Sequence, residues 1–142
     1  MNSMTISVVE AGPQAAVDAS RARGLEALYA TGHWLLSRGR IADAASVFRG
    51  MAMLAPGDER PWLALGACHE ALKQTKLAFE IYGVAQVLAG PAVRSRLARA
   101  RILSSSGRDD DAEAVRASAG EVAETLGDET LVALVSAERG AP

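Results

Sequence analysis

The chain has 142 residues, enough for one domain with its own core, and its formal net charge of −2 gives no overall attraction to nucleic acid or to an anionic membrane. Hydrophobic residues make up 49% of the chain and aromatic residues only 4%, so the apolar content is mostly Ala, Leu and Val, which favours an all-helical fold. The single cysteine excludes an internal disulfide and is typical of a reducing compartment.

The first segment of the chain, residues 1–13, has no regular pattern, and we expect it to be disordered. It lacks the basic region and the long apolar segment of a signal peptide. Nowhere does the sequence carry a run of about eighteen apolar residues, the length that a membrane-spanning helix needs. Together with the single cysteine, these features predict a cytoplasmic protein that binds neither membrane nor nucleic acid.

The next feature along the chain is an internal repeat. When the sequence is shifted along itself by 34 residues, two sets of small residues coincide. The sets are Gly32, Gly66 and Ala100, and Ala44, Ala78 and Ala112. Phe48 coincides with Tyr82 in the same alignment. A period of 34 residues is that of tetratricopeptide repeats, in which each repeat is a pair of antiparallel helices.

The repeat predicts an all-α, tetratricopeptide-like α-α superhelix of about three helix pairs with a C-terminal capping helix, in a single domain over residues 14–140. Gly39 and Gly107 end first helices, as glycine often does, and Pro56 closes the first repeat. The predicted helices lie at about 25–38, 41–54, 59–72, 75–88, 92–106 and 109–125, with the capping helix at about 128–139. They make up repeats at about 25–58, 59–92 and 93–126.

The glycines of the repeat have a steric explanation. Gly32 and Gly66 fall in the middle of first helices, where glycine costs about 1 kcal/mol relative to alanine. A helix keeps such a residue where a second helix needs the missing side chain. We therefore expect the paired helices to cross at these two positions, and Phe48 and Tyr82 to wedge between successive repeats.

Two features leave alternatives open. Arginines in the third repeat, Arg96, Arg99 and Arg116, stand where the other repeats place apolar residues. They indicate either a different helix register or an end repeat that faces solvent. Trp34 also falls outside the pattern, and it either packs on the segment Pro13–Arg23 or marks a surface for self-association.

The sequence contains no recognisable catalytic motif. It has no phosphate-binding loop, no dinucleotide-binding glycine pattern and no nucleophile elbow. His33 and His69 have no cysteine or carboxylate pair at metal-binding spacing beside them, and His69 falls at a packing position. Cys68 is expected to be a buried thiol, and Asp109–Asp111 to cap a helix rather than bind calcium. We therefore expect no catalytic residue, no metal, no cofactor and no enzymatic activity.

The predicted binding surface is a groove along the concave side of the stack, which first helices line. One face of each first helix supplies an apolar floor with a charged rim, which suits an extended peptide with leucine-like anchors. The predicted groove residues are Tyr29, His33 and Leu36 in the first repeat, Arg60, Leu63, Ala67 and Glu70 in the second, and Arg94, Leu97 and Arg101 in the third. The alternative is that the apolar groups pack against the N-terminal segment or adjacent repeats, and that the arginines only face solvent.

Parts of this sequence resemble the class II chaperones of bacterial type III secretion over about residues 25–125. In the first repeat the similarity lies in Tyr29–Gly32, Gly39–Arg40, Asp43–Ala44, Val47–Phe48 and Met53–Leu54. In the second it lies in Trp62–Leu72 and Ala78–Ala85, and the run Leu65-Gly66-Ala67-Cys68 is the most specific part. The resemblance fades in the third repeat.

This resemblance implies a cytoplasmic virulence-associated chaperone for the hydrophobic translocator proteins that form the secretion pore. Such chaperones hold an extended segment of the translocator in the concave groove and use no nucleotide. Tyr29, His33 and Leu36 match the pocket-forming positions of the family, which usually carries aromatic residues at all three, so His33 and Leu36 depart from it. The N-terminal region contributes to dimerisation in the family and is short here, which leaves a homodimer open.

Two other functions remain as alternatives to the chaperone. One is a generic tetratricopeptide adaptor or assembly factor that binds other proteins. The other is a hydrolase or transferase that uses His33 or His69. A clamp for the C-termini of heat-shock proteins is excluded, because such clamps resemble each other in placing lysine and asparagine where this chain has Tyr29 and His33.

Overall fold

The computed structural model describes residues 3–140, and their side chains from residue 12 onward. Over this range the chain forms helices only, which confirms the predicted all-α fold. They are α1 (Ser3–Ser37), α2 (Ile41–Leu54), α3 (Glu59–Ala71), α4 (Thr75–Leu88), α5 (Val93–Ser105), α6 (Asp109–Leu126) and α7 (Glu129–Gly140). From residue 41 on, the predicted helices agree with these bounds to within one residue at either end.

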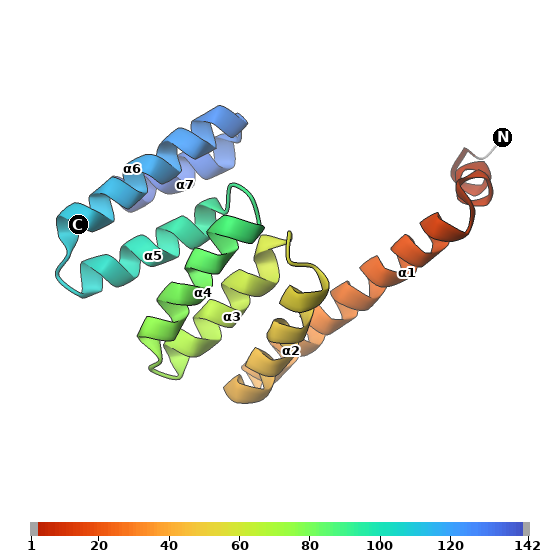
Figure 1. Ribbon diagram of the computed structural model, residues 1–142, viewed down its shortest axis with the longest axis horizontal. Helices are drawn as coiled ribbons and strands as arrows, with labels where there is room; N and C mark the ends of the chain where they lie inside the picture. The colour runs from red at the N-terminus through yellow and green to blue at the C-terminus, as the bar shows by residue number, and fades with distance from the viewer. Residues whose placement is uncertain (1–2, 141–142) are drawn as a thin grey trace.

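The helices stack in chain order, because each of them packs against the next one along the sequence. Figure 1 shows the result: the pairs α1/α2, α3/α4 and α5/α6 follow one another, and α7 lies against α6 at the far end. This is the architecture of a helical-repeat stack, in which each unit buries its apolar face mainly on its neighbours. The expected capping helix is therefore present as α7.

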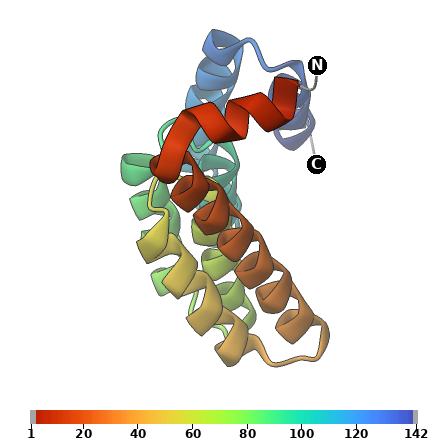
Figure 2. The same ribbon diagram turned by 90° about the vertical axis from the view of Figure 1, so that its right-hand side faces the viewer.

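Helix α1 begins far earlier than the expected residue 25. It is interrupted at Gly12, whose φ of 76° and ψ of −167° are not helical, and Pro13 then starts a second straight segment. Figure 2 shows the change of direction between the two segments. Nearly all side chains between Pro13 and Gly24 are exposed, and this part of α1 projects away from the stack (Figure 1). The expected disorder of residues 1–13 falls mostly on residues without described side chains and stays a prediction.

Trp34 lies on the outside of the stack. Its side chain is 52% exposed, and the guanidinium carbon of Arg38 lies 5.1 Å from the ring centroid. Packing of the segment Pro13–Arg23 on Trp34 is therefore wrong, because that segment continues the same straight helix and cannot fold back onto it. A role in self-association stays a prediction.

The two mid-helix glycines lie at the crossing points of paired helices, as expected. A Cβ atom built on Gly32 would lie 2.5 Å from Cε1 of Phe48, and one on Gly66 would overlap the ring of Tyr82 still more severely. Both rings are fully buried and also reach the next pair. Phe48 shares a core cluster with Leu65 of α3. Each aromatic ring thus fills a glycine notch in its own pair and joins that pair to the following one.

The divergent arginines of the third repeat are partly buried, and Arg99 packs against α4. Arg99 lies over the ring of Phe79, with 4.1 Å between its guanidinium carbon and the ring centroid, and donates a hydrogen bond to Gln86 at 2.5 Å. A Cβ on Gly83 of α4 would touch the same guanidinium, so the glycine makes room for it. Burial, together with the neighbouring charge of Arg96, lowers the pKa of Arg99. The helix bounds show no shift of register, and Arg99 is only partly exposed to solvent.

The turns between paired helices supply a first testable prediction. Gly39, Lys73 and Gly107 stand at equivalent places, 34 residues apart, and have φ angles of 74°, 63° and 79°. This left-handed conformation costs a residue with a Cβ about 1 kcal/mol more than glycine. We expect Lys73→Gly to raise the free energy of unfolding by about 1 kcal/mol, measured by urea denaturation followed by circular dichroism.

The control for this substitution is Glu80→Gly, which places a glycine at an exposed position in the interior of α4. Glycine destabilises a helix interior by roughly 0.5–1 kcal/mol, so the control should shift the urea midpoint downward. A downward shift with Lys73→Gly would contradict the assignment of strain to this turn.

Candidate functional site

The candidate site centres on one face of α3. Arg60, Leu63, Ala67 and Glu70 follow one another at spacings of three and four residues, which places them along a single stripe. The helix begins at this stripe because Asp58 caps it, its carboxylate accepting a hydrogen bond from the backbone N–H of Arg60 at 3.0 Å. One end of the stripe contacts α1 through Arg60 and Glu26, and the rest of the stripe lines a cavity together with residues of α5.

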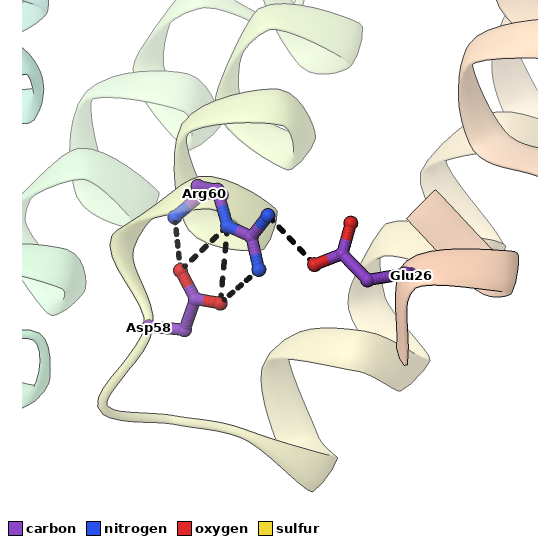
Figure 3. A network of polar contacts seen from close by, with 3 residues as sticks. All are labelled: Glu26, Asp58 and Arg60. Carbon is purple, nitrogen blue, oxygen red and sulfur yellow. Dashed lines mark hydrogen bonds and ion pairs between the residues drawn. The ribbon is translucent and has the colours of Figure 1, made fainter. Parts of the chain in front are cut away.

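Arg60 joins this stripe to α1. Figure 3 shows its guanidinium between two carboxylates, Asp58 at 2.9 Å and Glu26 of α1 at 2.9 Å. The hydrogen bond from Arg60 holds the pKa of Asp58 below its ordinary value, and the bonds to Asp58 and then Glu26 raise the pKa of Arg60. The guanidinium carbon also lies 5.2 Å from the ring centroid of Tyr29. These groups are largely exposed, so the network fixes the position of Arg60 more than it stabilises the fold.

The first-repeat residues of the predicted groove form an aromatic cluster. The ring centroids of Tyr29 and His33 lie 4.5 Å apart, and each ring also makes an edge contact with Phe48. His33 is exposed and Tyr29 is half-buried, so both present part of their surface to solvent. Leu36 packs against the first core cluster and is half-buried. The structure thus brings Tyr29, His33 and Arg60 together and turns Leu36 partly inward.

A cavity of about 240 Å³ lies on the other side of the stripe. Its lining residues are Leu63, Ala67 and Glu70 of α3, Tyr82 of α4, Arg94, Leu97 and Arg101 of α5, and Leu134 of α7. Small-molecule sites usually measure about 300–1,000 Å³, so this cavity has the size for a side chain rather than for a cofactor. It brings together the predicted groove residues of the second and third repeats, except Arg60.

Most polar groups of the cavity are satisfied within the chain. The hydroxyl of Tyr82 donates to Oε2 of Glu70 at 2.5 Å, and burial followed by this carboxylate raises the pKa of Tyr82, so the phenol stays protonated. Arg101 forms an ion pair of 2.6 Å with Glu138 of α7. Arg94 is exposed and has no hydrogen bond or ion pair to another side chain in the part of the chain that the structure describes.

The structure differs from the expected groove at Leu97. Its side chain is only 1% exposed and belongs to a core cluster with Val93 and Val135. The physical reason is that α7 packs over α5, so Leu97 forms the cavity wall and does not offer an open apolar surface. The equivalent residue of the second repeat, Leu63, remains half-buried, and Ala67 is exposed.

Sequence reasoning missed two residues of the cavity, Leu134 and Tyr82. Leu134 belongs to α7, which was expected only to cap the stack. The signal for it was the spacing of Leu131, Leu134 and Glu138, which lie three and four residues apart and therefore share one face of α7. Tyr82 was assigned to packing alone, although it also lines the cavity.

The described residues contain no group of three or more side chains suited to hold a metal ion. His69 is buried and shares a hydrogen bond of 2.6 Å with Gln74 at the turn after α3. Cys68 is buried as well, and burial raises the pKa of its thiol. Among residues 3–140, no helix has both the length and the apolar character to cross a membrane.

Comparison with known proteins rests on structures. No protein-family model and no curated protein sequence matches the chain. The structure is similar to SycD from Yersinia enterocolitica, a type III secretion translocator chaperone, with 28% identity over 92% of this chain and 98% of SycD and a TM-score of 0.74.

Two further structures are similar to it. PcrH from Pseudomonas aeruginosa is 30% identical over 84% of this chain and 91% of PcrH, with a TM-score of 0.70. SycD in complex with a peptide of the translocator YopD is 30% identical over 84% of this chain and 92% of that one, with a TM-score of 0.67. PcrH has also been solved with the chaperone-binding regions of PopD and PopB.

Proposed function

Since this chain belongs to the translocator chaperones of type III secretion, we propose that it holds an extended segment of a hydrophobic translocator protein in its concave groove. The bound segment would lie along the stripe of α3, with Tyr29 and His33 at one end and the cavity at the other. The observation that carries the proposal is the cavity between α3, α5 and α7, which joins aliphatic side chains to a charged mouth.

The physical benefit to the partner is the removal of apolar surface from water. Each square ångström of apolar area that the groove covers contributes roughly 25 cal/mol to the free energy of binding. Binding lowers the concentration of free partner chains, which are the ones that aggregate. Binding through the burial of apolar surface requires no nucleotide. The similar proteins SycD and PcrH are chaperones, and we propose no enzymatic activity for this protein. We place it in the cytoplasm, where the translocator resides before its export.

Co-expression with a hydrophobic translocator protein of a type III secretion system tests the proposal. We expect the translocator to remain in the supernatant and to copurify with this protein. The variant Tyr29→Glu/Leu63→Glu should lose the complex, because each carboxylate would place a charge on the apolar floor of the groove. Circular dichroism checks that the variant keeps its helix content, and a variant that is folded and still binds the translocator would refute the assigned groove.

The alternatives predict other results of the same experiment. A generic adaptor would leave the translocator insoluble with or without the double substitution. An enzyme that uses His33 or His69 would show turnover that is lost on replacement of that histidine while partner binding persists. The buried position of His69 and its bond to Gln74 favour a packing role for this residue.

A further inference from the structure

Arg94 is the cavity residue whose charge the described chain leaves without a partner. Glu70, which lines the same cavity, accepts a hydrogen bond from the hydroxyl of Tyr82, and the other arginine of the cavity, Arg101, is paired with Glu138 of α7. Arg94 itself is exposed and lines the cavity mouth. An arginine in such a place presents a planar set of donors that matches a carboxylate.

The surroundings of Arg94 increase its preference for an anion. It lies in the first turn of α5, which carries no acidic residue, at the end where the helix dipole is positive. The acidic side chain that reaches this turn is Glu59, and its Oε2 accepts hydrogen bonds from the backbone N–H and the hydroxyl of Ser95, at 2.9 and 2.8 Å. Glu59 thus satisfies Ser95, and Arg94 remains available.

Arg94 shares the cavity with four aliphatic side chains. Leu63, Ala67, Leu97 and Leu134 line the same space, which is large enough for one apolar side chain of a partner. In an extended peptide, residues two apart point the same way and lie roughly 6.6 Å apart, and adjacent residues lie about half that distance apart. Adjacent side chains point to opposite faces, so a carboxylate that reaches Arg94 would stand two residues from the side chain that fills the cavity.

We propose that this cavity selects an extended segment in which Asp or Glu stands two positions before or after an aliphatic residue, and that Arg94 binds the acidic side chain. The inference rests on the proposed function, because it specifies the partner segment of the same groove. The third repeat would then recognise one apolar and one acidic side chain of the bound segment. At the other end of the groove, near Tyr29, Arg60 is already paired with Asp58 and Glu26.

A phage-displayed library of random dodecapeptides tests the proposal without knowledge of the translocator. Selection on the wild-type protein should enrich Asp and Glu two positions before or after Leu, Ile or Val. Selection on Arg94→Gln should return the acidic residues to their frequency in the library while the aliphatic residue stays enriched. Arg94→Glu should select Lys and Arg instead. The control Arg49→Gln removes the same charge from an exposed place on α2 outside the cavity and should leave the wild-type preference.

The affinity of one selected peptide, labelled with fluorescein, then measures the coupling between the charge of Arg94 and that of the peptide's acidic residue. We expect Arg94→Gln to weaken its binding about fivefold to tenfold, and replacement of the peptide's acidic residue by its amide to weaken it by the same factor. The two changes together should cost no more than either alone, which is the signature of a direct pair. Equal acidic content in all selected pools, or independent effects of the two changes, would overturn the proposal.

The experiments separate this inference from the function on which it rests. If the translocator copurifies but the selected peptides show no acidic preference, the inference on Arg94 fails and the chaperone function stands. If the peptides show the preference but no translocator is held, the proposed function fails and the recognition stands. If a second copy of this chain fills the cavity, Ala67→Trp will lower the mass measured by light scattering, and the peptide assignment is overturned.

Discussion

Ala67→Trp should lower the affinity for the translocator about a hundredfold or more, the loss typical of a central anchor in an interface. Ala67 is exposed on α3 and lines the cavity of about 240 Å³. An indole at this position would occupy the space that we propose a side chain of the partner fills. The substitution lies outside the core, and we expect the free energy of unfolding to stay the same. Calorimetric titration with the copurified translocator segment and urea denaturation measure the two quantities.

The matched control is Ala114→Trp, which adds the same indole to an exposed position of α6 that does not line the cavity. It should bind the translocator as the wild type does. Equal affinity of both variants would mean that the partner does not enter the cavity, whereas loss of binding in both would point to a general effect of the surface indole.

Gly66→Ala should destabilise the protein by about 2–3 kcal/mol, a large part of the stability of a small domain. The new methyl group would overlap the ring of Tyr82, which is only 2% exposed and whose hydroxyl is fixed by Glu70. The ring cannot turn away without breaking that bond and opening the adjoining core. Steric overlap therefore outweighs the roughly 0.5–1 kcal/mol by which alanine favours a helix over glycine.

The comparison for Gly66 is Gly50, a glycine in the interior of α2 where an added Cβ would meet nothing within 4 Å. Gly50→Ala should raise the free energy of unfolding by about 0.5–1 kcal/mol, so the same substitution has opposite signs at the two positions. Urea denaturation of both variants decides the matter. A stabilising effect at Gly66 would show that the crossing of α3 and α4 is looser than described.

The sequence predicted the stack from residue 41 onward because its repeat is enforced by sterics. A small residue at Gly66 and a ring at Tyr82 depend on each other, and the turn glycines mark where helices end. The projecting part of α1 could not be predicted in this way. Its side chains between Pro13 and Gly24 contact little of the stack, so no apolar period marks them, and helix formation there relies on local propensity.

The candidate site was predictable only as far as the repeat holds. Tyr29, Leu63 and Leu97 are equivalent positions, and equivalence suggested three similar groove residues. The third is buried because α7, which has no counterpart in the earlier pairs, covers its side of α5. The pairing of Arg101 with Glu138 escaped prediction for the same reason, since it links residues outside one repeat unit.

The contribution of Leu134 and Glu138 has a consequence for the timing of biosynthesis. A ribosome that has completed the three helix pairs has made most of the groove, yet the wall of the cavity that α7 supplies is still missing. Domains commonly begin to fold from the N-terminus while they are being translated. With this cavity as the proposed binding site, we expect the nascent stack to bind its partner incompletely until α7 has emerged and docked, so that binding is completed only after synthesis.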